Sequence, residues 1–130
     1  MVSAPSTPFR GEIWWTTSPG EESDETARQP VLIVQNDVGN AHARTVIAAV
    51  VSAEAPRKRY PQVVPISTDL LGRPATVRCD IIRTFEKAHL LGRAAVLPRE
   101  TMAEVDAALC RSLALRPGTG RHGDDEIAAG

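Results

Sequence analysis

Apolar residues along the chain gather into short runs, and this pattern predicts strands for most of the sequence. Near-continuous runs at 30–35 and 45–52 are typical of central strands that are covered on both faces. The predicted strands cover 11–16, 30–35, 45–52, 62–67, 76–85 and 90–98. Pro65 interrupts the fourth run and predicts an edge strand or a bulge there, because proline donates no hydrogen bond to a ladder.

One segment has a helical period instead. Met102, Val105, Leu109 and Leu113 recur at spacings of three, four and four, which places them on one face of a helix within 99–115. We expect that face to dock on the sheet. Pro98 suits the first turn or the cap of this helix.

The connections between the predicted strands are too short for parallel crossovers, so the strands should pair antiparallel. The chain is therefore predicted to be mainly β, a small barrel with a C-terminal helix. We expect one folded domain over 9–116, a flexible arm over 1–8 and a disordered acidic tail over 117–130. The polar stretch 35–40 is predicted to be a structural turn, with Gly39 in a conformation that other residues avoid.

Charge and composition narrow the class of protein. A formal net charge of −1 argues against a generally basic nucleic-acid coat, although Arg57, Lys58 and Arg59 form a local basic run. That run has two interpretations, a solvated loop or a footprint for phosphates. No apolar run approaches the roughly 20 residues of a membrane span, and the first residues lack signal-peptide features, so we expect a cytoplasmic protein. Cys79 and Cys110 are predicted to be buried thiols.

Motifs for common enzyme chemistry are absent from the sequence. It has no phosphate-binding P-loop, no dinucleotide fingerprint, no zinc-protease motif and no nucleophile elbow. His42 and His89 are isolated, and His122 falls in the predicted tail, so no histidine pair is evident for a metal or for acid–base catalysis. Composition and spacing alone therefore stop at a β-rich domain.

Several stretches in order resemble one protein family, the MazF/PemK toxin endoribonucleases. The similarity runs from Arg10 to Leu115 and rests on five fragments at compatible spacing. These are RGEIWW, PVLIVQNDVGN, TVIAAVVS, IRTFEK and MAEVDAALCRSLAL.

The resemblance implies a partly open SH3-like barrel that forms a symmetric homodimer. It also implies an enzyme that cuts single-stranded RNA at short sequences without a metal or other cofactor, held inactive by a cognate antitoxin. In that reaction the ribose 2′-hydroxyl is the nucleophile and leaves a 2′,3′-cyclic phosphate. The protein has only to align this hydroxyl and stabilise charge on phosphorus.

Individual site residues follow from the resemblance position by position. The family has a catalytic arginine directly before the proline of its second strand, where this chain has Gln29, with Arg28 one place earlier. A one-residue slip points a side chain to the other face of a regular strand, so we expect relaxed alternation to let Arg28 take the catalytic role, with Gln29 as the alternative. Ser52 stands where the family has a threonine, and it keeps the hydroxyl. Ile81 stands where the family often has glutamine.

Other positions are candidates for contacts with RNA. Asp24, in the acidic loop 21–25, occupies a place where the family often has glutamate; a solvated loop or contacts to base edges are both consistent with it. Arg57, Lys58 and Arg59 would track the RNA backbone. Two other functions remain open: a gyrase-poisoning toxin with a CcdB-like barrel, and a catalytically weak family member kept for antitoxin binding.

Overall fold

The computed structural model describes residues 7–17, 28–53 and 61–116. Asp24 and the basic run Arg57–Arg59 lie outside the described residues, as does most of the predicted arm and all of the predicted tail. The elements in chain order are β1 (Glu12–Thr17), β2 (Arg28–Ile33), α1 (Asp37–His42), β3 (Thr45–Ser52), β4 (Val63–Ile66), α2 (Thr68–Leu71), β5 (Ala75–Glu86), the 3₁₀ turn η1 (Lys87–His89), β6 (Leu90–Val96) and α3 (Arg99–Leu113).

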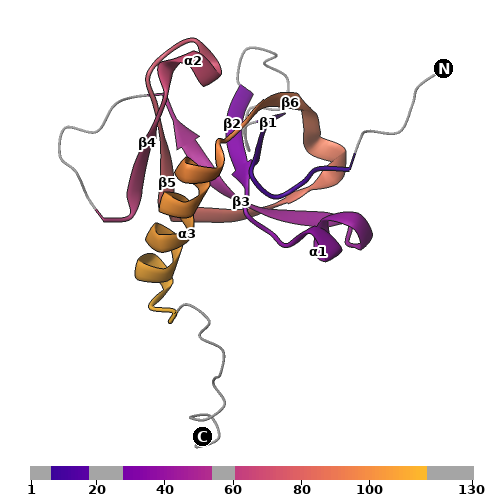
Figure 1. The fold of residues 1–130 in the computed structure, drawn as a ribbon. Helices are drawn as coiled ribbons and strands as arrows, with labels where there is room; N and C mark the ends of the chain where they lie inside the picture. The colour runs from indigo at the N-terminus through magenta and orange to yellow at the C-terminus, as the bar shows by residue number, and fades with distance from the viewer. Residues whose placement is uncertain (1–6, 18–27, 54–60, 117–130) are drawn as a thin grey trace, which may run out of the picture.

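The strands form one six-stranded antiparallel sheet in the order β4-β5-β3-β2-β1-β6 (Figure 1). The sheet is strongly curved but not closed, since β4 and β6 are its two edges. Both the partly open antiparallel architecture and the C-terminal helix predicted from sequence are confirmed. Pro65 lies in β4, so the prediction of an edge strand is correct.

Each face of the central strands carries its own apolar cluster, because side chains alternate along a strand. One cluster lies under α3 and includes Ile13, Leu32 and Val51 together with Val105 and Leu109 of the helix. The other contains Trp14, Val31, Ile33, Val46, Ala48, Phe85 and Leu90. Because both faces of β2 and β3 are covered, the sequences of these strands are nearly continuous apolar runs.

Helix α3 lies against β4 and β5 (Figure 1) and begins after Pro98, which is its N-cap. Val105, Ala108 and Leu109 are buried, as the predicted face requires. The prediction is wrong for Leu113, which is 52% exposed, because the last turn of the helix extends beyond the sheet that it covers. An ion pair of 2.8 Å between Arg10 and Asp106 links the start of the chain to the exposed side of α3.

The polar stretch after β2 forms a short helix, α1, rather than the simple turn predicted. Asn40 is fully buried; its side-chain nitrogen donates to the Gln35 carbonyl, and its side-chain oxygen accepts from Gln35 Nε2. The prediction for Gly39 is wrong, because its φ is not positive. Glycine instead leaves room for the Gln35 side chain, since a Cβ at position 39 would lie 3.1 Å from Gln35 Cδ. The structural role predicted for this corner is nevertheless correct.

Both cysteines are free thiols, but only Cys79 is buried, so the prediction of two buried thiols is half wrong. Burial raises the pKa of Cys79 to about 11, which keeps it protonated at neutral pH. Cys110 lies on α3 and is partly exposed because only one side of this helix faces the sheet. Within the described residues, no helix has the length and apolar character needed to cross a membrane.

Candidate functional site

Strand β2 is regular from its first residue. Its ladder with β1 pairs Arg28 with Thr17, Gln29 with Thr16 and Pro30 with Trp15. The expectation of relaxed alternation at Arg28 is therefore wrong, because β1 holds this end of the strand in register. Arg28 and Gln29 consequently lie on opposite faces of the sheet.

A pocket of about 320 Å³ lies at the end of the sheet where β2 begins, β3 ends and α2 leads into β5. Its lining includes both Arg28 and Ser52, two of the three predicted catalytic residues. Ser52 is the last residue of β3, partly exposed and opposite Thr76 of β5. The complete described lining is Trp15, Arg28, Pro30, Val51, Ser52, Ala53, Leu71, Arg73 and Ala75.

Gln29, the third predicted catalytic residue, forms hydrogen bonds within the protein. Its Nε2 donates to the Val51 carbonyl at 2.8 Å and to the Pro30 carbonyl at 3.0 Å. A glutamine side chain has two N–H donors, so this pattern uses both of them. In this arrangement Gln29 ties β2 to β3 and has no N–H left for a phosphate.

The pocket is electropositive. Arg28 and Arg73 are its charged lining residues, and none of the described residues that line it is acidic. Both arginines are exposed, and neither forms an ion pair with a residue that the structure describes. Arg78, by contrast, binds Asp80 through two hydrogen bonds, which lower the pKa of that carboxyl. Among the described residues, the two pocket arginines therefore place positive charge beside apolar walls, where it attracts an anion.

Residues 9–113 match the model of the PemK-like, MazF-like toxins of type II toxin–antitoxin systems. The chain belongs to this family. The match spans the sheet and all of α3, and it includes every described residue of the pocket lining.

Individual relatives of the MazF-like family agree with this assignment. The chain is 35% identical over 109 residues to Endoribonuclease EndoA of Bacillus subtilis (strain 168), covering 82% of this chain and 94% of that one. A solved mycobacterial endoribonuclease in complex with its cognate antitoxin is 25% identical, with a TM-score of 0.71 over 85% of this chain and 98% of the other. A MazE–MazF structure from Deinococcus radiodurans has the same fold, with a TM-score of 0.70 at 24% identity over 85% of this chain and 99% of that one.

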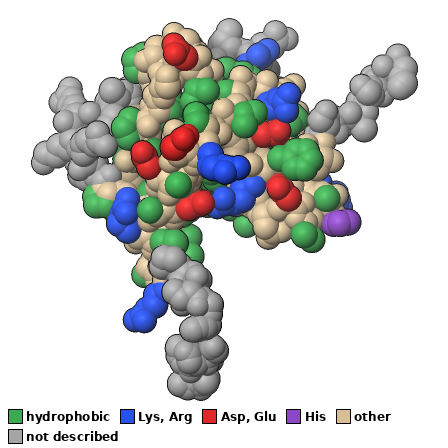
Figure 2. Space-filling view, viewed as in Figure 1, with side chains coloured by type: hydrophobic (Ala, Val, Ile, Leu, Met, Phe, Trp, Pro, Cys, Tyr) green, Lys and Arg blue, Asp and Glu red, His purple; other side chains and the backbone are tan. Residues whose placement is uncertain are grey.

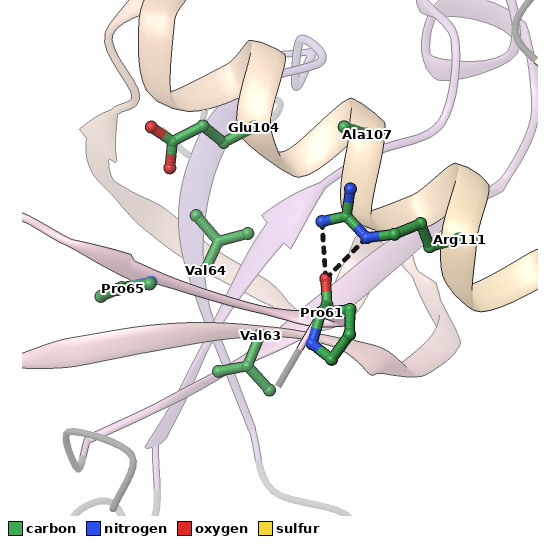
Figure 3. Close-up of a pocket in the computed structure, with 7 residues that line it drawn as sticks. All are labelled: Pro61, Val63, Val64, Pro65, Glu104, Ala107 and Arg111. Carbon is green, nitrogen blue, oxygen red and sulfur yellow. Dashed lines mark hydrogen bonds between the residues drawn. The ribbon is translucent and has the colours of Figure 1, made fainter. Parts of the chain in front are cut away.

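A second hollow of this MazF-like chain lies between α3 and β4 and measures about 420 Å³ (Figure 3). Its one described cation, Arg111, donates from Nη2 and Nε to the Pro61 carbonyl, at 2.8 and 3.3 Å. Glu104 lines the same hollow, so the described lining carries one negative and one positive side chain. Acidic and basic side chains are likewise mixed on the face that carries α3 (Figure 2). Neither feature favours an anionic ligand here.

Trp15 and Arg73 line the first pocket but were not predicted from sequence. Trp15 belongs to the opening fragment RGEIWW of the MazF-like pattern, and nothing in the sequence distinguishes it from its neighbour Trp14. Arg73 follows Gly72 in the connection between the predicted strands 62–67 and 76–85, and no motif distinguishes it. Ile81 lies in β5 where the register to β3 shifts, and it is partly buried. No group of three His, Cys, Asp or Glu residues suited to a metal ion occurs within the described parts of the chain.

Proposed function

We propose that this MazF-like toxin is an endoribonuclease that cuts single-stranded RNA at short sequences, with Arg28 and Ser52 as its reacting-site residues. The observation that carries the proposal is the pocket whose lining includes both Arg28 and Ser52. The name of the Bacillus relative, an endoribonuclease with 35% identity, supports the reaction class. A cytoplasmic location fits such an RNA target.

The proposed chemistry needs no group beyond RNA, water and side chains. The 2′-oxygen attacks the adjacent phosphorus and loses its proton to water; the bond from phosphorus to the 5′-oxygen breaks, and that oxygen takes a proton from water. The products are a 2′,3′-cyclic phosphate and a 5′-hydroxyl. Ser52 would hydrogen-bond the 2′-hydroxyl and hold it in line. Arg28 would bind the non-bridging oxygens, whose negative charge grows in the transition state.

Gln29 has a supporting role in this proposal. By binding the Pro30 and Val51 carbonyls it fixes the start of β2 against the end of β3. That contact sets the separation between the backbones that carry Arg28 and Ser52. Asp24 is proposed to lie near the RNA bases, and the basic run Arg57–Arg59 near the RNA backbone.

Incubation with a long unstructured RNA in excess EDTA tests the proposal. We expect discrete cuts whose 5′ ends carry a hydroxyl and whose 3′ ends carry a cyclic phosphate. Intact RNA combined with inhibition of gyrase would instead support a CcdB-like toxin. Intact RNA combined with antitoxin binding would identify a family member that has lost catalysis. Sequencing the fragment ends gives the cleavage motif.

A cognate antitoxin and a second copy of the chain are the proposed protein partners. The edge strand β6 exposes Leu91 (49%) and Val96 (54%), and an edge strand with apolar side chains favours association. We predict a homodimer that buries on the order of 1,600 Å² in total. Sedimentation equilibrium at micromolar concentration should give twice the chain mass of 14.0 kDa, and a single 14.0 kDa species would refute the prediction.

The basic run gives a prediction about salt. If Arg57, Lys58 and Arg59 each neutralise one phosphate, they contribute roughly −2 to the slope of log affinity against log salt, at about −0.7 per single-strand contact. Replacing all three by alanine should flatten the slope by that amount. Binding titrations between 50 and 200 mM salt measure it, and an unchanged slope would identify the run as a solvated loop.

A further inference from the structure

The electropositive pocket contains three side chains that the proposed reaction leaves without a role: Trp15, Leu71 and Arg73. At about 320 Å³ the pocket lies at the lower end of the range for small-molecule sites. A hollow of this size suits one nucleotide rather than a longer segment.

Arg73 is held by the turn that ends α2. Gly72 is the C-cap of that helix, at φ 79° and ψ 6°, and its N–H donates to the Thr68 carbonyl. Pro74 follows Arg73 and restricts it to an extended backbone. Between this left-handed glycine and the proline the backbone has little freedom, so the Arg73 side chain starts from a defined backbone position. Its charge adds to that of Arg28 in the same lining.

Trp15 provides an aromatic surface in the same pocket. The residue is partly exposed, whereas its neighbour Trp14 is only 5% exposed and packs in the second apolar cluster. Opposite Trp15 in the ladder stand Pro30 on β2 and Gly92 on β6. A Cβ on Gly92 would have no heavy atom within 4 Å, so open space adjoins the tryptophan strand on that side. An accessible indole beside two guanidinium groups is a typical surface for binding single-stranded nucleic acid.

We propose that this pocket is a nucleotide subsite of the RNA groove, in which Arg73 and Arg28 hold a backbone phosphate and Trp15 stacks on the adjacent base. The inference rests on the proposed function, since the RNA is the substrate of that reaction. Stacking is indifferent to base identity, so the pocket adds affinity without specifying a base. An acidic peptide of the antitoxin would also bring negative charge to the arginines. An indole together with two guanidinium groups nevertheless favours a nucleotide, which has both a base and a phosphate.

Binding is measured with single-stranded oligonucleotides of randomised sequence that carry 2′-O-methyl groups, which lack the nucleophile. In wild-type protein we expect quenching of tryptophan fluorescence. Arg73→Ala should weaken affinity about 10-fold and flatten the salt slope by about 0.7. Trp15→Leu should weaken affinity about 10-fold and remove the quenching, while Trp15→Phe should keep affinity within about three-fold, because a phenyl ring still stacks. Arg99→Ala removes an exposed arginine outside the pocket and should change neither affinity nor slope.

Folding of each variant is checked by near-ultraviolet circular dichroism. Wild-type affinity and slope in both Arg73→Ala and Trp15→Leu would overturn the subsite. Loss of antitoxin binding in these variants with unchanged oligonucleotide affinity would also overturn it, and would assign the pocket to an acidic peptide. Failure of the proposed function is recognised separately, since wild-type protein would then leave cleavable RNA intact in EDTA whatever the variants bind.

Discussion

Ser52→Ala is expected to lower the single-turnover rate of RNA cleavage by about 10²-fold, the lower end for loss of a positioned group that shares a proton in the transition state. The serine is the last residue of β3 and lines the electropositive pocket beside Arg28. Alanine keeps the strand and removes only the hydroxyl, so the 2′-hydroxyl of the substrate loses the partner proposed to align it. Substrate affinity should change little, because the arginines remain.

Two controls make this result specific. Ser52→Thr restores the residue type of the MazF/PemK pattern and should keep the rate within a few-fold. Thr45→Ala removes a hydroxyl from the opposite end of the same strand and should leave the rate unchanged. A rate in Ser52→Ala equal to that of wild type would exclude the hydroxyl from the mechanism.

The strands were predictable because their apolar runs are long enough to carry a period. Runs at 45–52 and 30–35 correspond to β3 and to most of β2. The two short helices were missed, since α1 and α2 have six and four residues, too few for a helical period to appear. Their capping residues were visible in the sequence: Asn36 accepts from the Gly39 N–H, and Ser67 accepts from the Asp69 N–H. Capping residues without a following amphipathic run look like ordinary turn residues.

The site was only partly predictable, for a different reason. Arg28 and Ser52 were recognised because they stand close to positions of a known pattern. Arg73 comes 45 positions after Arg28 in the chain, and only the antiparallel pairing of β3 with β5 brings the turn after α2 to the pocket. The engagement of Gln29 depends on the carbonyls of Pro30 and Val51, and residue identity does not reveal such backbone partners.

Arg28 gives the other large expected effect. Arg28→Ala should reduce the cleavage rate by about 10²–10³-fold, the scale for losing one preorganised donor to a developing charge. Because the strand is regular, relaxed alternation no longer supports Arg28, but the pocket does: its lining includes Arg28 and Ser52, whereas Gln29 is not among the described lining residues and has both N–H donors occupied. Arg99→Ala, which removes an equally exposed arginine outside the pocket, should leave the rate unchanged.

Variants at Gln29 then distinguish the two positions. Gln29→Ala should cost about 1 kcal/mol of folding stability, through the lost hydrogen bonds, and slow cleavage only about 10-fold, by loosening β2 against β3. Gln29→Arg restores the family pattern but should change the rate by less than about three-fold, because its guanidinium would emerge on the face of β2 opposite to Arg28. Single-turnover rates and urea unfolding measure both effects. A large gain in Gln29→Arg, with wild-type activity in Arg28→Ala, would place the scissile phosphate on the Gln29 face, because a charged donor stabilises a phosphorane better than an amide does.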